Sequence, residues 1–312
     1  MINLKLKIDH VHLKVSDLEK SLEFYQSILG FKIVRRESNT AFLSSDINNS
    51  SFFLIALTEL NNALKAQRKQ RVAGLYHFAI LLPERRYLSY FLKHIQKNLI
   101  TEYYEGMADH AVSESIYIHD PDFNGIEVYR DRAPSEWKWN DHTVHMVTEP
   151  LDVQGLLKES IDGNNEWNEL PPKTSIGHVH LHVSNLANAK KFYQEILGLN
   201  HTATFPGAYF FAANRYHHHV ATNTWLGENI PSAIDNSRLG LDHYAINVDS
   251  QNDLFFLKNR FLEFKIVIDE EQLIENDNKY PSSFYAYDYD GIKIQFLYNN
   301  PTKKYNKLNN TI

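Results

Sequence analysis

The chain has 312 residues, enough for about two domains, and 43% of them are hydrophobic, which excludes the collagen-like and intrinsically disordered classes. The net charge of −6 argues against binding nucleic acid by phosphate neutralisation, and no apolar run approaches the roughly 18 residues that a membrane span needs. There is no cysteine and no signal-peptide pattern, so we expect a cytoplasmic protein without disulfides or thiolate metal sites.

The first 131 residues predict two similar units, each made of a strand, a helix and three strands. Apolar side chains alternate with a period of two over residues 8–15, which predicts a half-buried strand. Ser16 and Glu19 form a capping-box pattern that opens a helix, and Gly30 ends it. Further strands are predicted at 31–35, 40–44, 51–57, 75–82, near 102, at 115–119 and at 125–130, with a second helix from Pro83 to about Asn98.

The C-terminal half of the chain repeats the N-terminal half. IDHVHLKVSDLEKSLEFYQSILG at 8–30 returns as IGHVHLHVSNLANAKKFYQEILG at 176–198, and GLYHFAILL from Gly74 returns as GLDHYAINV from Gly240. A repeat of this length indicates two copies of one domain. We therefore predict domains at 8–131 and 176–299, joined by a linker over 132–175 that contains one short helix.

Histidines are clustered in the repeated segments. The chain has 16 of them, including pairs or triplets near the starts of the two copies and the run HHH at 217–219. Histidine is a common metal ligand and the usual general base near neutral pH, although a buried histidine with one satisfied hydrogen bond serves structure alone. The clustering favours a functional site without locating it.

These motifs resemble those of the vicinal oxygen chelate superfamily, which includes glyoxalases, bleomycin and fosfomycin resistance proteins and extradiol ring-cleavage dioxygenases. The motifs are DHVHLKVSDLEKSLEFYQSILGF, GLYHFAILLP, DHAVSESIYIHDPDFNGIEVY, and GHVHLHV with YHHHVATNTW, and they cover nearly the whole chain. The resemblance implies an α+β fold of four βαβββ modules, paired into two homologous domains with cupped mixed sheets. The two-domain length is most similar to catechol-2,3-dioxygenase-type proteins.

The resemblance also implies a metal site. It places the ligands at His10 on the first strand, His77 on the first strand of the second module, and Glu127 on the last strand of that module. Two imidazoles and one carboxylate leave coordination positions open and favour Fe(II), with Mn(II) as an alternative. The rival interpretation is three unrelated inward-facing polar residues.

The second copy departs from this pattern. It keeps His178 and His243 but has Gln295 where the carboxylate is expected. A neutral amide is a weaker ligand, so we place the metal in the N-terminal domain. Whether the C-terminal copy, with His217, His218 and His219 nearby, also binds metal or is the true active site stays open.

Three further residues are implied as catalytic by the resemblance. His110 matches an acid–base histidine, Tyr117 matches a tyrosine that contacts a substrate hydroxyl, and His218 matches a histidine beside bound O₂. The site would then cleave a catechol-type aromatic diol with O₂, as a catechol 2,3-dioxygenase-like oxidoreductase (EC 1.13.11.-). For His218, a solvated polar strand edge is an equally good explanation.

Two other functions stay open. A glyoxalase-type isomerase or thiol-adding resistance enzyme would use the metal only as a Lewis acid, but such enzymes more often carry two carboxylate ligands. A non-catalytic protein that binds an aromatic ligand would not need an intact set of metal ligands. The sequence identifies neither the ring substituents nor the oligomeric state, although exposed sheet edges would allow a homo-oligomer.

Overall fold

Two eight-stranded mixed sheets form the framework of the molecule. The computed structural model describes residues 5–47, 52–61, 71–160, 166–233, 237–269 and 283–299. One sheet has the strand order β16-β17-β18-β15-β1-β4-β3-β2, and the other has the order β12-β13-β14-β11-β5-β8-β7-β6. Each sheet is therefore built from two modules whose first strands lie side by side at its centre.

The module-1 and module-4 strands make the first sheet. Its central strands, β1 and β15, pair antiparallel, and each also pairs in parallel with the last strand of its own module. The strand bounds are β1 Leu6–Val15, β2 Lys32–Glu37, β3 Thr40–Ser44, β4 Ile55–Glu59, β15 Gly240–Val248, β16 Ile268–Asp269, β17 Ser283–Tyr287 and β18 Lys293–Leu297.

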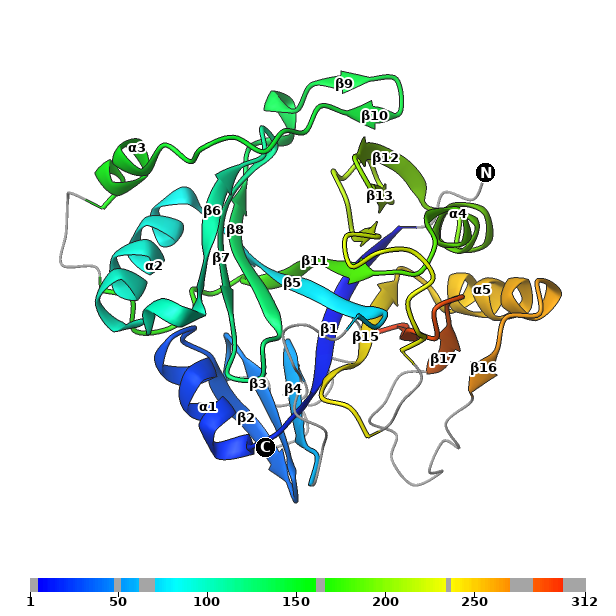
Figure 1. Ribbon diagram of the computed structural model, residues 1–312, viewed down its shortest axis with the longest axis horizontal. Coiled ribbons are helices and arrows are strands. Elements are labelled where there is room, and N and C mark those ends of the chain that lie inside the picture. The colour runs from blue at the N-terminus through cyan, green and yellow to red at the C-terminus, as the bar shows by residue number, and fades with distance from the viewer. Residues whose placement is uncertain are drawn as a thin grey trace, which may run out of the picture.

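The module-2 and module-3 strands make the second sheet in the same way, with β5 and β11 antiparallel at its centre. In Figure 1 this sheet is U-shaped, with β5 and β11 at the base and β6 and β12 on opposite arms. The strand bounds are β5 Gly74–Leu82, β6 Tyr104–Asp109, β7 Ser113–His119, β8 Gly125–Asp131, β11 Ser175–His182, β12 Asn200–Phe205, β13 Ala208–Ala212 and β14 Val220–Asn223.

This pairing differs from the division that we predicted at residues 8–131 and 176–299. The α+β class and the four βαβββ modules are confirmed, but neither half of the chain forms a sheet from its own two modules. The reason is that the first strands of modules 1 and 3 are nearly identical and those of modules 2 and 4 are closely similar, so the sequence allows either partner at each central edge. Sequence similarity identifies the repeats but not which repeats pair.

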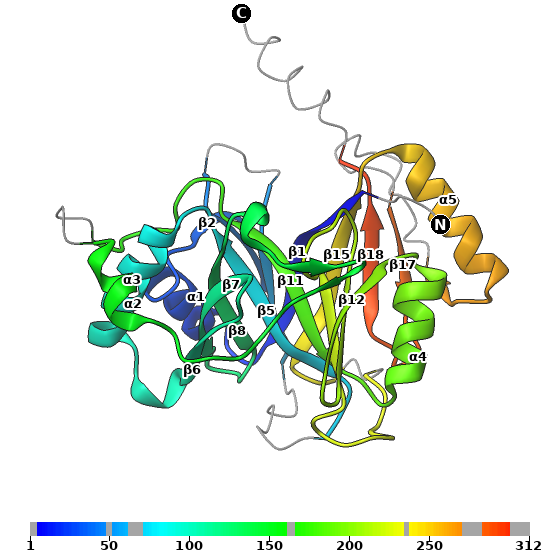
Figure 2. The same cartoon turned by 90° about the horizontal axis from the view of Figure 1, so that it is seen from above.

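The helices cover the outer faces of the sheets. Figure 2 shows α1 (Leu18–Ser27), α2 (Arg85–Asn98) and α3 (Val153–Lys158) at one end, with α4 (Leu186–Lys190) and α5 (Gln251–Glu263) at the other. A π-helical turn, η3 (Lys191–Ile196), continues α4. The helices pack apolar side chains on the sheets, and one large hydrophobic cluster includes residues of both sheets, beside two smaller clusters among the described residues. Within the described ranges, no helix combines the length and apolar character required to cross a membrane.

The start of α1 differs in detail from the predicted capping box. Asp17, not Ser16, is the N-cap, and its carboxylate accepts from the Lys20 N–H at 2.9 Å. Ser16 instead donates its N–H and hydroxyl to Asp122, in the turn before β8. Gly30 ends the helical segment with φ +83°, as predicted, and a Cβ there would lie 2.8 Å from the Leu170 backbone nitrogen.

The predicted linker contains more structure than one helix. Besides α3 it holds the 3₁₀ turn η2 (Pro134–Glu136) and a short hairpin of β9 (Trp139–Asn140) and β10 (Thr143–Val144). Figure 1 shows this hairpin across the open end of the U, where β10 contacts β12. The linker thus connects the two arms of the second sheet as well as the two halves of the chain.

Candidate metal centre

Three acidic or imidazole side chains converge at the base of the U-shaped sheet. They are His77 on β5, Glu127 on β8 and His178 on β11, and all three are buried. Nε2 of His77 lies 3.1 Å from Glu127 Oε2, and Nε2 of His178 lies 3.0 Å from the same oxygen. The two imidazole centroids are 5.6 Å apart. The ligand atoms of the three residues all lie within 4.8 Å of one another, a spacing that allows them to hold one ion.

The strand register explains this convergence. In the parallel pair of β5 and β8, His77 lies opposite Gly125, so Glu127 two residues later projects from the same face of the sheet. On the antiparallel side of β5, a register irregularity between Ile176 and His178 brings the His178 side chain to that face. The three strands β11, β5 and β8, which lie side by side in the sheet, thus supply one ligand each.

Electrostatics favour an ionised carboxylate in this cluster. Burial alone would raise the pKa of Glu127, but the imidazole N–H groups of His178 and His77 outweigh it and hold the pKa well below its ordinary value. Burial lowers the pKa of His178 to about 4, so its imidazole is neutral. Ser115 adds a hydrogen bond of 2.5 Å to the second oxygen of Glu127. The cluster is therefore a buried carboxylate with three side-chain partners, His77, His178 and Ser115.

This donor set fits a divalent cation. A carboxylate that is only 2% exposed requires a compensating positive charge or full hydrogen bonding, and the neutral His178 ring beside it supplies no charge. Nδ1 of His178 is buried and has no hydrogen-bond partner among the described residues. Two imidazole nitrogens and one carboxylate oxygen are the ligands that Fe(II), Mn(II) and Zn(II) accept, and a three-residue set leaves positions for other ligands.

His10 does not lie in this cluster. It is buried on β1, in the other sheet, where Nδ1 is 2.9 Å from Asp9 and the ring lies 5.6 Å from that of His243. The expected meeting of His10 with His77 and Glu127 is therefore not found, because module 1 pairs with module 4. His178, the counterpart of His10 in the second copy, occupies the place that we assigned to His10.

His110 and Tyr117 lie at one side of the cluster. His110 Nε2 is 2.6 Å from the Tyr117 hydroxyl, and the Tyr117 ring centroid is 5.6 Å from that of His77. His110 Nδ1 donates to the Val147 carbonyl at 2.7 Å, so Nε2 carries the lone pair and accepts from the tyrosine. Burial raises the pKa of Tyr117 well above its ordinary value, which keeps its hydroxyl protonated.

His218 lies at the other side of the cluster. It is 6% exposed, and its ring centroid is 4.1 Å from that of His178. Burial lowers the pKa of His218 well below its ordinary value, so the ring is neutral. The run at 217–219 is buried throughout and precedes β14, which excludes the solvated strand edge that we considered. The three residues predicted to be catalytic thus flank a cluster that contains two of the three predicted ligands.

Other residues at the site were not found from the sequence. Ser115 lies on β7 beside Glu127, and Tyr129 packs 5.0 Å from the His178 ring. Gly177 provides room for Tyr129, because a Cβ at that position would lie 1.7 Å from the tyrosine hydroxyl oxygen. Ser115 lies two residues before the predicted Tyr117 on β7, and Tyr129 lies two residues after the predicted Glu127 on β8. Because side chains alternate between the faces of a strand, this spacing alone would have indicated Ser115 and Tyr129.

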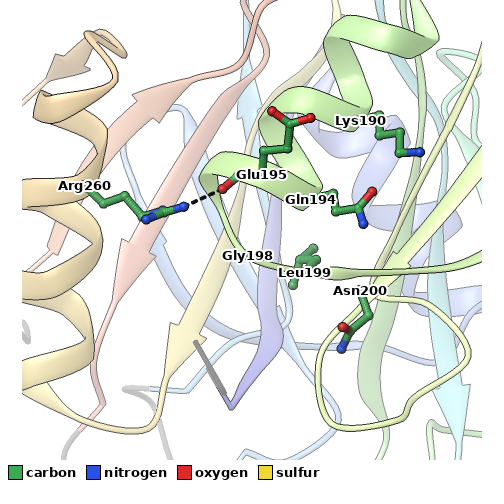
Figure 3. A pocket seen from close by; sticks show the side chains of 7 residues that line it. All are labelled: Lys190, Gln194, Glu195, Gly198, Leu199, Asn200 and Arg260. Atoms are coloured by element: carbon green, nitrogen blue, oxygen red, sulfur yellow. Dashed lines mark hydrogen bonds between the residues drawn. The ribbon is translucent and has the colours of Figure 1, made fainter. Parts of the chain in front are cut away.

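A surface pocket of about 480 Å³ lies elsewhere, between η3 and α5. Figure 3 shows Arg260 pointing to the end of η3, where it donates to the carbonyls of Glu195 and Ile196, each at 2.6 Å. His94 makes the equivalent contact with Ser27 at the end of α1. Arg260 therefore satisfies helix-end carbonyls. The pocket is lined by Lys190, Gln194, Glu195, Gly198, Leu199, Asn200 and Arg260, none of which is a predicted site residue.

The fold and the cluster together define a paired βαβββ protein with a two-histidine, one-carboxylate centre. The chain belongs to the Glyoxalase/Bleomycin resistance protein/Dioxygenase superfamily, whose model matches residues 7–128 and 175–296. It is 37% identical over 268 residues to a catechol-2,3-dioxygenase of Bacillus subtilis, covering 85% of this chain and 90% of that protein. It is also 26% identical over 150 residues to a probable trivalent organoarsenical cleaving enzyme of the same species, covering 47% of this chain and 96% of the relative.

Solved structures show the same fold. A dioxygenase candidate from Bacillus subtilis matches with a TM-score of 0.63 at 12% identity, over 95% of this chain and 86% of that one. Glyoxalase I from Zea mays matches with a TM-score of 0.55 at 17% identity, over 99% of this chain and 98% of the maize chain. At these identities the structural likeness supports the architecture, and the reaction must be argued from the site.

Proposed function

We propose that this protein is a metal-dependent extradiol-type dioxygenase that cleaves a catechol-type aromatic diol with O₂. The observation that carries the proposal is the cluster of His77, Glu127 and His178, with the His110–Tyr117 pair on one side and His218 on the other. The similarity to a catechol-2,3-dioxygenase over most of both chains supports the same reaction class.

His77, Glu127 and His178 would hold the metal, with Fe(II) as the first choice and Mn(II) as the second. When bound, such an ion supplies Lewis acidity that lowers the pKa of a diol hydroxyl, together with free positions at which two small ligands can meet. Glu127 provides the only anionic donor of the three. Ser115 holds its second oxygen and so fixes the plane of the carboxylate.

The remaining roles belong to the flanking side chains. Tyr117 is protonated and lies next to His77, so its hydroxyl can donate a hydrogen bond to a substrate oxygen. His110 has its lone pair on Nε2, so it can accept the proton that a diol or the tyrosine gives up. The ligand side chains and His218 are buried, and low-dielectric surroundings strengthen each of these interactions.

Two alternatives keep weaker support. A glyoxalase-type isomerase remains compatible with the fold, as the maize structure shows for that protein, but the cluster contains a single carboxylate. A thiol-adding resistance enzyme would use the metal in the same Lewis-acid role. A non-catalytic binding protein would not need a buried carboxylate with two imidazoles directed to one of its oxygens.

The test is anaerobic reconstitution of the metal-free protein with Fe(II), followed by catechol and air. A yellow ring-opened product, followed by its visible absorbance, supports the dioxygenase. Parallel reconstitution with Mn(II) identifies the preferred metal. Isomerisation of the methylglyoxal–glutathione adduct in place of diol cleavage would overturn the proposal in favour of the glyoxalase type. Diol binding without turnover in either metal form would favour a binding protein.

A further inference from the structure

A hydrogen-bond chain leads from Asp131, at the end of β8, to the buried ring of His218. Asp131, the last residue of β8, lies four positions after Glu127, and its Oδ1 is 2.9 Å from Nε2 of His217. Nδ1 of His217 is 2.7 Å from Nδ1 of His218. His217 has no solvent exposure, and the His218 ring packs on that of His178. Asp131 and His217 have no part in the mechanism proposed above.

The protons in this chain can be assigned by counting donors and acceptors. An ionised carboxylate only accepts, so the hydrogen between Asp131 and His217 must sit on Nε2 of His217. A neutral His217 then has its lone pair on Nδ1. The short contact between the two Nδ1 atoms needs one hydrogen, which must come from His218. His218 is therefore protonated on Nδ1 and carries its lone pair on Nε2.

The other carboxylate oxygen of Asp131 also accepts a hydrogen bond. Tyr216 donates its hydroxyl to Oδ2 at 2.8 Å, and the Tyr129 hydroxyl lies 2.8 Å from that of Tyr216. Because Tyr216 uses its hydrogen on Asp131, Tyr129 must be the donor in the second contact. Every hydrogen in the network thus points toward Asp131. The Asp131 carboxylate thus sets the direction of all of these bonds.

We infer that Asp131 and His217 are positioning residues that fix His218 as the Nδ1–H tautomer, with an unprotonated Nε2 beside the candidate metal centre. His218 then accepts a hydrogen bond or a proton from a bound molecule and does not donate one. This deepens the proposed function, on which only the activity part of the test rests. The assignment is that of two neutral imidazoles.

The second copy of the domain suggests the substitution that tests this inference. The repeat places Asn299 at the position equivalent to Asp131, and its amide nitrogen donates to Asp9 at 2.9 Å. An asparagine at position 131 could likewise donate, in this case to Nε2 of His217. His217 would then carry its hydrogen on Nδ1 and donate to His218. The tautomer of His218 would change to Nε2–H without loss of the hydrogen-bond chain.

The experiment is ¹⁵N NMR of histidine-labelled full-length protein, both metal-free and loaded with diamagnetic Zn(II), with H218Q used to assign the resonances. In the wild type we expect a protonated Nδ1 and an unprotonated Nε2 at His218. D131N should exchange the two, and D131E, which keeps an acceptor, should restore the wild-type pattern. A wild-type His218 protonated on Nε2, or a pattern that D131N leaves unchanged, would overturn the inference.

Activity provides a second measurement with Fe(II)-reconstituted protein and catechol. If His218 acts as an acceptor, D131N should lower kcat by up to the roughly 10²–10⁴-fold that a positioned acid–base group contributes, with KM and metal content near wild type. D131E should recover most of that loss. If the protein proves not to cleave diols, the NMR result still decides the tautomer. A correct tautomer with no effect of D131N on kcat would restrict Asp131 and His217 to a structural role.

Discussion

The two sheets contain the same arrangement of side chains at their centres, but only one of them has a buried carboxylate there. In the second sheet, Glu127 lies on β8 opposite Ala79 of β5. In the first sheet, Gln295 lies on β18 opposite Ala245 of β15, the equivalent position. The paired imidazoles match as well: His77 and His178 are 5.6 Å apart, and so are His243 and His10.

The surroundings follow the same correspondence. Tyr117 lies 5.6 Å from His77, and Tyr285 lies 5.2 Å from His243. Ser115 is 2.5 Å from Glu127, whereas its counterpart Ser283 accepts from the Gln295 amide only at 3.5 Å. The backbone geometry is therefore retained while the ligand chemistry has changed.

The negative charge in the first sheet lies around the imidazoles instead of between them. Asp9 is 2.9 Å from Nδ1 of His10, and Asp242 is 2.7 Å from Nδ1 of His243. Lys14 lies 3.8 Å from Asp242 and offsets part of that charge. The same strand pairing thus places an amide in the first sheet where the second has a carboxylate, and the group spaced to hold an ion in the first sheet is a different one, His12, Asp242 and His243.

The largest effect is expected when this difference is removed. E127Q gives the second sheet the donor set of the first, so metal affinity should fall by more than the roughly 10–100-fold that loss of a group supporting a ligand costs. Activity should fall with it. Metal content by mass spectrometry after Fe(II) or Zn(II) loading, together with catechol turnover, measures both.

The reciprocal variant, Q295E, provides the matched control. It should create at most a second, weaker metal site, so the stoichiometry should lie between one and two ions per chain, while diol turnover stays at the wild-type level. Wild-type metal content in E127Q would show that the ion binds elsewhere.

A second pair of variants tests which halves of the chain supply the ligands. H178A should lose metal and turnover to a similar extent as E127Q, because His178 completes the cluster from β11. H10A should keep both, because His10 belongs to the other sheet. Metal stoichiometry of the two purified variants decides the point. Loss of metal in H10A and retention in H178A would restore the arrangement expected from the sequence.

A smaller effect is expected at the side of the cluster. H110A should keep its metal and lose roughly 10²–10⁴-fold in turnover, because His110 accepts from Tyr117 and contacts no ligand atom. Y117F should behave similarly, since it removes the donor of the same bond. Its equivalent in the first sheet, Y285F, is the control and should leave turnover unchanged. If H110A loses its metal, His110 is a ligand and the cluster must be redrawn.

The smallest effect concerns stability rather than activity. Burial raises the pKa of Asp288 to about 7 and that of its counterpart Asp120 to about 6, where the Asn124 amide stabilises the charged form. Each aspartate accepts from a buried tyrosine, Tyr193 or Tyr25. A carboxyl whose pKa is raised on folding stabilises the protein below about pH 4, and this contribution is lost as pH rises through the folded pKa.

The free energy of urea unfolding of the metal-free protein should therefore fall between about pH 4 and pH 7. D288N should flatten more of this slope than D120N, because the pKa of Asp288 is raised further. Equal slopes in both variants and the wild type would show that these carboxyls ionise normally in the folded protein.

The sequence allowed the modules and most of the site to be predicted. The alternation of apolar residues and the helix-ending Gly30 are local signals, so the strands and helices were placed within a few residues. His77 and Glu127 lie on two strands of the same module, and both were matched by motif. His110 and Tyr117 follow from the same motif, and the structure brings them within hydrogen-bond distance.

The third ligand could not be predicted because it depends on which modules pair. β5 could have paired with β1 or with β11, and their sequences around His10 and His178 are nearly identical. The hydrogen-bond chain from Asp131 to His218 has the same origin, since it joins β8 to the turn before β14 across the two halves. The repeat sets Asn278 of the second copy against His110, and Asn278 lies outside the described residues.

The exchanged pairing also constrains how the chain reaches its native state during synthesis. The central edge of β5 cannot pair until β11 has been synthesised. In the same way β1 cannot pair with β15 until most of the chain is made, because Leu6 pairs with Val248. Such distant contacts make folding slow, and unpaired strand edges invite association with other chains in the meantime. A ribosome-bound chain that ends after β8 would therefore carry two open central edges and an incomplete ligand set, and would need protection until its second half emerged.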